Sequence, residues 1–255
     1  MLTISESQLA AWLSPLFWPF LRTLAVFTSA PVFSSRAFPL RAKIALAFLI
    51  AVAAQASLPE MPVIALDSAS AFGAVAQQVG VGLAIGFAVR LVFSAVELAG
   101  EVIGFQMGLN FASFFDPMIN AQSSATARFF GQIAALLFLA VNAHLWLVMA
   151  ITQSFHAFPV DQNFLHAAQG MAMYQLGAEL FASALWIALP MVGIMLFVNL
   201  ALGIISRVAP QMNIFAVGFP VTLVVGMLGI AATLPMLDRP YMALMEKAIT
   251  VFNGG

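Results

Sequence analysis

The sequence predicts an all-α integral membrane protein, and two observations lead to that prediction. Hydrophobic residues make up 63% of the chain and charged residues only 7%, whereas an ordinary soluble domain has about 45–50% and about 25%. The apolar residues also gather in about six long segments kinked by proline, with one polar interruption near the middle. Nineteen charges, nine basic and ten acidic, are too few to cover a soluble surface of 255 residues.

The composition also excludes several classes of protein. The chain has no cysteine, which removes disulfide frameworks, thiolate chemistry and cysteine metal sites. The three histidines, His144, His156 and His166, form neither HxxxH nor HExxH. There is no phosphate-binding loop and no nucleophile elbow, and a net charge of −1 offers no basic patch for nucleic acid. We therefore expect no metal, no cofactor, no nucleic-acid partner and no enzymatic activity.

The first hydrophobic segment, residues 9–33, carries residues that are unusual inside a membrane helix. It contains Pro15, Pro19 and Arg22. Proline removes a backbone donor and bends a helix, and an intramembrane arginine needs partners, so we expect a kinked or broken helix. The stretch before it has Glu6 and no Lys or Arg, which does not match a secretory signal, so we expect it to be retained.

Flanking charges assign sides of the membrane to the next segments. Residues 34–43 hold three basic side chains, Arg36, Arg41 and Lys43. The positive-inside tendency places this loop in the cytoplasm and the N-terminus outside. Residues 44–58 are short for the about 20 residues that a spanning helix needs, and residues 59–70 carry acidic but no basic side chains, which suits the outer side. A third segment, residues 71–89, returns and ends at Arg90.

The C-terminal half adds three further crossings. Residues 129–151 form the clearest single span, and the loop at residues 152–175 has no Lys or Arg, which places it outside. Residues 176–237 form a helical hairpin of two proline-containing segments. The inner turn of this hairpin is marked by Arg207, Pro210 and Gln211. The simplest count is six crossings with both ends outside.

The stretch at residues 97–128 differs from the apolar segments around it. If residues 97–109 are helical at about 100° per residue, five residues fall within an arc of roughly 100° on one face. They are Glu97, Gly100, Glu101, Gly104 and Gly108. Glycines four residues apart allow close helix packing. Two carboxylates in an apolar environment need partners or water, and Arg90 and Arg128 are the nearest basic residues. We expect a polar seam beside a close helix contact.

A loop follows this helix. Asp116-Pro117 cannot lie inside a helix, so we expect a loop at residues 110–127 with Phe111, Phe114 and Phe115 at its mouth. Because the basic residues on both sides look cytoplasmic, residues 91–115 are predicted to enter the membrane and return. Non-helical backbone at that depth needs a protein shelter or a wet cavity. The three phenylalanines are then either core aromatics or a hydrophobic constriction of a pore.

Two blocks of sequence resemble a known family. GEVIGFQMGLNFASFFDP, at residues 100–117, is followed by the polar run NAQSSATARFF, and ISRVAPQMNIFAVGFP occupies residues 205–220. Both blocks resemble the FliR and SctT export-gate family of type III secretion systems, and the resemblance covers essentially the whole chain.

The resemblance implies one membrane-embedded export-gate domain over residues 1–255, with N-terminal helices and a plug loop in 1–128 and the remaining helices in 129–255. Helices of that family coil into a closed cone. A single copy would assemble with FliP- and FliQ-type subunits, near FlhB- and FlhA-type components, among the lipids of the bacterial inner membrane at the flagellar basal body. Unfolded flagellar proteins would pass through this gate. The implied plug comprises Phe111, Phe114, Phe115, Asp116 and Pro117.

Two other interpretations stay open. Glu97 and Glu101 lie one turn apart, so the pair can share a proton or a cation, as in a proton-coupled secondary transporter or channel. That interpretation predicts internal repeats, and no convincing inverted repeat is visible in the sequence. The other alternative is a purely structural membrane scaffold, in which altering the phenylalanine loop would not affect the permeability barrier.

Overall fold

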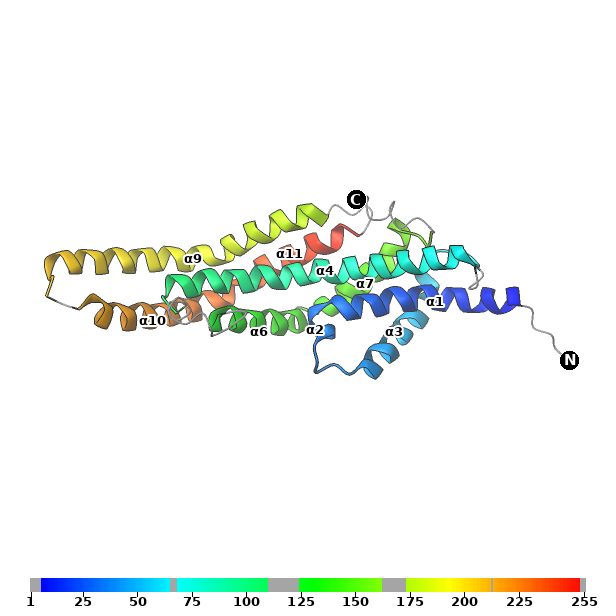
Figure 1. Ribbon diagram of the computed structural model, residues 1–255, viewed down its shortest axis with the longest axis horizontal. Coiled ribbons are helices and arrows are strands. Elements are labelled where there is room, and N and C mark those ends of the chain that lie inside the picture. The colour runs from blue at the N-terminus through cyan, green and yellow to red at the C-terminus, as the bar shows by residue number, and fades with distance from the viewer. Residues whose placement is uncertain (1–5, 65–67, 110–123, 162–172, 212, 253–255) are drawn as a thin grey trace. The chain divides into compact units, whose positions relative to one another are not determined.

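A computed structural model describes residues 6–64, 68–109, 124–161, 173–211 and 213–252 (Figure 1). The chain divides into two compact units. The first combines Met1–Leu91, Phe138–Gly177 and Met245–Gly255, and the second combines Val92–Leu137 and Ala178–Leu244. Each unit therefore takes segments from both of the halves, 1–128 and 129–255, that the sequence analysis distinguished. The described residues of both units form helices and no strands.

The first unit is built around α1. Its helices are α1 (Glu6–Ser29), α2 (Pro31–Ser34), α3 (Leu40–Ala54) with the 3-10 turn η1 (Gln55–Ser57), the first part of α4 (Ala69–Gln106), and α7 (Ala143–Ala157). The helix α1 packs against α2, α3 and α7. It runs without interruption through Pro15 and Pro19, so the expectation of a possible break there is wrong. The chain leaves the helix at Ala30, directly before Pro31, because the residue before a proline avoids the helical conformation.

The helices α1 and α4 approach each other most closely at two glycines. A methyl group added to Gly82 would lie 2.7 Å from the Cβ of Ala25, and one added to Gly86 would lie 2.8 Å from the carbonyl oxygen of Val26. Both distances are too short for a real side chain. The glycine spacing of four residues is the one that membrane helices use for close contacts, and here the partner surface is largely the backbone of α1.

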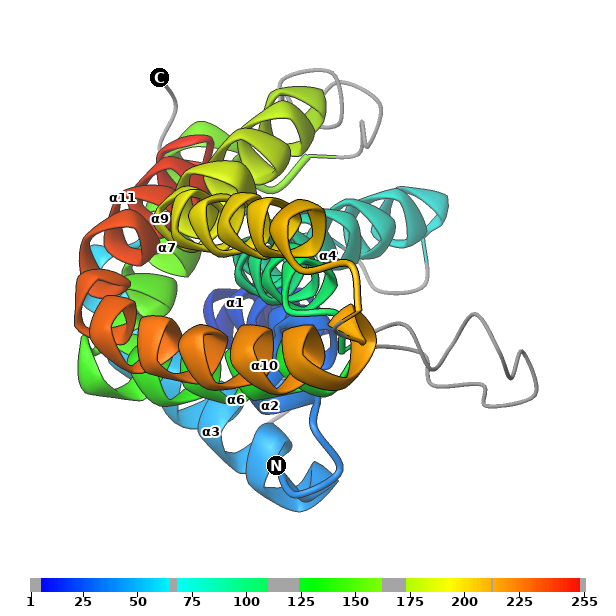
Figure 2. The same cartoon turned by 90° about the vertical axis from the view of Figure 1, so that its left-hand side faces the viewer.

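The second unit contains the last part of α4, most of α6 (Ala125–Ala140) and of α9 (Met173–Val208), all of α10 (Ile214–Thr233) and of the 3-10 turn η2 (Leu234–Met236), and the first half of α11 (Asp238–Thr250). Figure 2 shows the hairpin of α9 and α10, coloured yellow and orange. The hairpin is the one that the sequence predicts at residues 176–237. Its helices differ from the expected bounds by a few residues at the ends.

Four helices among the described residues are long and apolar enough to cross a membrane, and a fifth crossing results if the bent pair α6 and α7 is one span. The four are Leu40–Ser57, Ser70–Gln106, Tyr174–Val208 and Ala216–Met236. The predicted class, an all-α integral membrane protein, is confirmed. The expected count of six crossings is not reached, since α1 is not among these helices.

One predicted boundary, the end of a segment at Arg90, is absent from the structure. The helix α4 is 38 residues long and continues past Arg90, so the prediction that one segment ends at Arg90 and a separate re-entrant passage begins at Leu91 is wrong. Arginine is a good helix former, and its side chain is exposed here. A single charge on a long side chain marks a position along a helix and does not end it.

The predicted single span at residues 129–151 is not one continuous helix. The helix stops at Ala140, and α7 begins at Ala143 after a local bend of 71°. Asn142 has a φ of 55°, in the left-handed region that asparagine tolerates better than most residues. The hydropathy of this stretch is continuous, so a polar residue with unusual backbone freedom is the signal that marks the break.

Candidate functional site

The candidate site consists of the end of α4 and the start of α6, which flank residues 110–123 in the sequence. We refer to residues 110–123 as the central segment. The predicted plug residues Phe111, Phe114, Phe115, Asp116 and Pro117 lie outside the described residues. The residues that flank the central segment are described, and all of them belong to the second unit. They define how the segment is attached.

On the N-terminal side, α4 ends in a Schellman motif. The amide of Leu109 donates to the carbonyl of Gly104 at 3.1 Å, and the amide of Gly108 donates to the carbonyl of Phe105 at 3.1 Å. Gly108 has a φ of +77°, which glycine adopts without a Cβ penalty. The helix therefore ends because of Gly108, well before Asp116-Pro117. Gly108 therefore ends the helix, and it is not a third packing glycine after Gly100 and Gly104.

The end of α4 is attached to α10. The hydroxyl of Thr222 donates to the carbonyl of Met107 at 3.3 Å. The Met107 side chain is buried and fills the space above Gly226, where an added methyl group would lie 2.5 Å from its Cε. A hydrogen bond to a helix-end carbonyl and a side chain seated over a glycine fix this end of α4.

On the C-terminal side, Ser124 begins α6 and binds Glu101. Its hydroxyl donates to Oε2 of Glu101 at 2.5 Å, and its amide donates to the same oxygen at 3.3 Å. The hydroxyl also accepts from the amide of Ala127 at 3.1 Å, which is the geometry of a helix N-cap. One serine thus caps α6 and ties its first turn to the carboxylate of α4.

Both ends of the central segment therefore attach to the last turns of α4. Glu101, which holds Ser124, lies two turns before Gly108 on the same helix, about 10.5 Å along its axis. We refer to Glu101, Met107, Gly108, Ser124 and Thr222 as the segment base. The carboxylate was predicted from the sequence as part of a polar seam, whereas its partner Ser124 was missed, although a Ser-x-Thr sequence before an apolar run is a typical N-cap signal.

The other predicted residues of α4 contact α6. A methyl group on Gly100 would lie 2.9 Å from the ring of Phe130, and one on Gly131 would lie 2.8 Å from Oε1 of Glu97. Each helix thus supplies a glycine that admits a side chain of the other. Gly104, which lies between Gly100 and Gly108 on α4, is also buried. The predicted close packing is present at Gly100, but an aromatic ring rather than a backbone fills it.

The two carboxylates have different surroundings. Glu97 is exposed and lies against Gly131, while Glu101 is half-buried and accepts from Ser124. Arg90 and Arg128 are both exposed, Arg90 on α4 in the first unit and Arg128 on the first turn of α6.

The predicted inner turn lies between α9 and α10. Arg207 is in the last turn of α9, and Pro210 and Gln211 follow it in the connection. All three are exposed. A basic side chain at a helix C-terminus is favourable beside the unpaired carbonyls. Asn213 accepts at 3.3 Å from the amide of Ala216 and caps α10.

Sequence reasoning did not anticipate the surroundings of Arg22. Its side chain is 0% exposed. The guanidinium donates to Oε1 of Gln78 at 2.8 Å, to the hydroxyl of Ser154 at 2.9 Å and to the carbonyl of Phe158 at 2.7 Å. It also lies 3.6 Å from the centroid of the Phe155 ring. Its hydrogen-bond partners among the described residues are thus neutral and come from α4 and the end of α7.

The polar contacts extend beyond Arg22 through Gln77. Gln78 donates to Oε1 of Gln77 at 2.8 Å, and the same oxygen accepts from the amide of Asp161 at 2.8 Å. Gln77 in turn donates to the carbonyl of Pro159 at 3.0 Å. The sequence signal was available, because an arginine in one apolar segment and a pair of glutamines in another need each other.

One buried phenol belongs to the second unit. Tyr241 of α11 packs edge-to-face on Phe93, with ring centroids 6.3 Å apart. Burial raises the pKa of the Tyr241 hydroxyl above its ordinary value, and no partner for this oxygen occurs among the described residues. The ring is therefore a neutral packing element.

The geometry defines a class of protein: an α-helical integral membrane protein with an attached segment at the end of one long helix. Residues 13–248 match the family model for bacterial export proteins, family 1. The chain is 41% identical over 239 residues to the flagellar biosynthetic protein FliR of Escherichia coli, covering 93% of this chain and 90% of that protein. The FliR of Bacillus subtilis is 34% identical over 209 residues, covering 81% and 80%.

The chain therefore belongs to the bacterial export proteins, family 1, among the FliR flagellar biosynthetic proteins. The resemblance found in the sequence is confirmed. Membership indicates a membrane-embedded protein with a role in flagellar export and an association with the flagellar export apparatus. Its relatives are named as biosynthetic proteins and not as enzymes.

Proposed function

We propose that this chain is a subunit of the flagellar export gate in the bacterial inner membrane. With FliP- and FliQ-type subunits it forms the channel through which unfolded flagellar proteins leave the cell, beside FlhB- and FlhA-type components. The observation that carries the proposal is the segment base: in a member of an export family, both ends of residues 110–123 attach to the same end of α4.

The central segment is proposed to be the plug of that channel. It contains Phe111, Phe114, Phe115, Asp116 and Pro117. Apolar rings close a pore by excluding water. The contacts of Ser124 with Glu101 and of Met107 with Thr222 support this role, because they fix the two points between which the segment lies. Gly108 supports it further, since its φ of +77° directs the chain out of the helix.

The hairpin of α9 and α10 is proposed to contact the partner subunits. Only 17% of the most apolar window of α9 and 22% of that of α10 is buried, against 56% for α4. Its exposed side chains are large and apolar, among them Leu185, Trp186, Phe197, Leu200, Val224 and Leu228. Gly193 and Gly203 face open space within the described residues. Such a surface suits neighbouring helices of FliQ-type subunits.

Co-purification tests this function. The chain is expressed in detergent-extractable form with candidate FliP- and FliQ-type partners, and separately alone. We expect a defined heteromeric complex in the first case and an unstable or aggregated chain in the second. A well-behaved monomer that carries proton-dependent flux in liposomes would instead favour a transporter that uses Glu97 and Glu101.

A further inference from the structure

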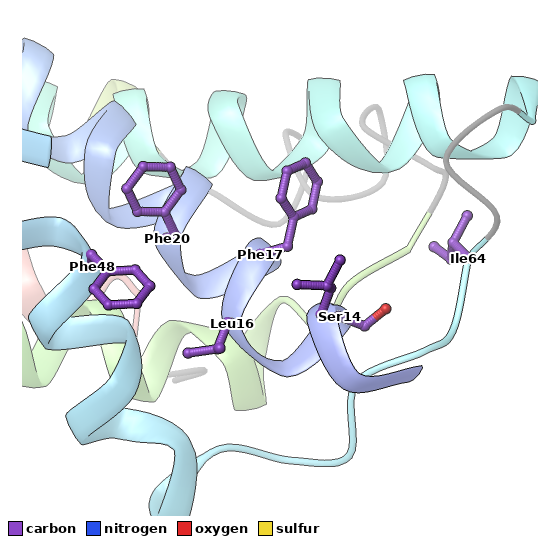
Figure 3. A pocket seen from close by; sticks show the side chains of 7 residues that line it. Ser14, Leu16, Phe17, Phe20, Phe48 and Ile64 are labelled. Carbon is purple, nitrogen blue, oxygen red and sulfur yellow. The ribbon is translucent and has the colours of Figure 1, made fainter. Parts of the chain in front are cut away.

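A groove between α1 and α3 lies in the first unit, away from the segments used above. Its deeper part is a cavity of about 200 Å³ lined by residues of α1, by Phe48 of α3 and by Ile64. Figure 3 shows the side chains, with Phe17 and Phe20 on α1 and Phe48 facing them from α3. Apart from Ser14, the lining side chains are apolar. Nothing in the proposed export function requires a cavity here.

A second hollow continues this cavity towards the start of α3. It has a volume of about 440 Å³ and is lined by Phe20, Arg41, Ile44, Ala45 and Phe48. Phe20 and Phe48 line both hollows, so the two form one groove. Arg41 is seven residues from Phe48 on the same helix, which corresponds to about 10.5 Å along the axis. The groove is thus apolar along its length and carries a cation at one end.

Positive charge gathers at that end. Arg41 is flanked in sequence by Arg36 and Lys43. The helix α3 starts at Leu40 with no side-chain cap and no acidic residue in its first turn, so its amide groups add a further positive field. The same loop is the one that the positive-inside tendency assigns to the cytoplasmic side, where acidic lipids supply negative surface charge.

We infer that this groove binds an acidic phospholipid, with one acyl chain between Phe20 and Phe48 and the headgroup phosphate at Arg41. The cation at one end of the groove and the small size of its deeper cavity select this occupant. A helix of another protein has a diameter of about 10–12 Å and does not fit a cavity of about 200 Å³, whereas an extended hydrocarbon chain does. The inference is independent of the export function.

The test measures lipid retained by the full-length chain, purified with its partner subunits if it requires them. The protein is incubated with mixed micelles that contain phosphatidylglycerol or phosphatidylcholine, and bound lipid is counted by native mass spectrometry. Ala45→Trp fills the groove from an exposed position of α3. Ala53→Trp is the matched control, because Ala53 is exposed on the same helix and does not line the groove.

Wild type and Ala53→Trp are expected to retain phosphatidylglycerol, and Ala45→Trp to lose it. Arg41→Gln, a change at an exposed position, is expected to weaken phosphatidylglycerol binding about tenfold or more, because it removes a charge-assisted hydrogen bond to the phosphate. Binding of phosphatidylcholine, whose phosphate is balanced by its own choline cation, should fall by a smaller factor in this variant.

Three outcomes would overturn the inference. One is equal retention of phosphatidylglycerol by the two tryptophan variants. Another is the absence of a charge effect, seen either as unchanged phosphatidylglycerol affinity in Arg41→Gln or as phosphatidylcholine binding to the wild type as tightly as phosphatidylglycerol. The third is a second copy of the chain in this place, seen as a dimer that Ala45→Trp dissociates on size-exclusion chromatography.

Discussion

Arg22 shows how a charge is accommodated inside an apolar unit. Its guanidinium has five donors in a planar fork, and three of its hydrogen bonds reach Gln78, Ser154 and the carbonyl of Phe158. The Phe155 ring covers one face. A cation with no acidic hydrogen-bond partner among the described residues is tolerated because several dipoles and a ring share its charge. One residue thereby connects α1 with α4 and α7.

Replacing Arg22 should therefore destabilise the first unit. Arg22→Met keeps much of the side-chain volume but leaves the buried polar groups of Gln78 and Ser154 unpaired. We expect a loss of about 2–4 kcal/mol, measured as a lower thermal unfolding midpoint in detergent. Arg22→Lys should recover only part of it, since one ammonium does not reproduce the fork. Arg90→Met, an exposed control, should be near neutral, and an equally stable Arg22→Met would disprove this role.

The pair Ser124 and Glu101 supports a second prediction at the residue scale. Ser124→Ala removes both the N-cap of α6 and the contact with the carboxylate, so we expect about 1–2 kcal/mol of destabilisation. Combining it with Glu101→Ala in a double-mutant cycle should give a coupling energy of about 1 kcal/mol. Additive effects of the two changes would show that the hydrogen bond at the segment base contributes nothing.

At the scale of elements, glycines serve three different purposes that spacing alone does not separate. Gly86 lets α4 approach the backbone of α1, Gly100 receives the Phe130 ring, and Gly108 ends a helix. The sequence pattern placed the glycines of residues 100–108 on one face and correctly indicated contact there. It did not indicate that Gly108 terminates the helix, because periodicity describes faces and carries little information about ends.

Two glycine substitutions distinguish folding from assembly. Gly86→Leu must clash with the carbonyl of Val26 and the amide of Ala30, at 2.8 Å and 2.9 Å from an added methyl group, and backbone atoms cannot move aside cheaply. We expect it to abolish the folded chain. Gly203→Leu enters open space and should leave folding unchanged while lowering the yield of complex with partner subunits. The amount of chain in the membrane fraction and the yield of complex after co-expression with the partners provide the two readouts, and a normal amount of Gly86→Leu chain in the membrane would contradict the account.

The sequence predicts some helix boundaries well and misses others. The predicted hairpin at residues 176–237 corresponds closely to α9 and to α10 with η2, because long apolar runs between polar turns are the strongest signal of a membrane helix. The break at Asn142 was missed, since one asparagine hardly changes hydropathy over a window. The predicted helix end at Arg90 was wrong for the opposite reason. A single charge lowers the local hydropathy, but the backbone of α4 stays helical there.

At the scale of the whole molecule, composition was sufficient for the class and the two sequence blocks were sufficient for the family. The site was only partly predictable. Gly108 and Glu101 were recognised from the sequence, whereas Ser124 and Thr222 act through contacts between distant segments, Ser124 with Glu101 and Thr222 with Met107. Side-chain contacts of that kind depend on how α4, α6 and α10 pack, which no local pattern specifies.

The central claim is that residues 110–123 close a channel while the segment base holds their ends. The most direct test is the ion leak of membranes that contain the assembled gate. Phe114→Ala combined with Phe115→Ala should raise the leak of small ions at least about tenfold, because shorter side chains no longer keep the pore dry. The control is Phe72→Ala, which removes a ring that is 79% exposed at the start of α4, and its leak should equal that of the wild type. An unchanged leak in the double variant, with normal yield of the complex, would contradict the account.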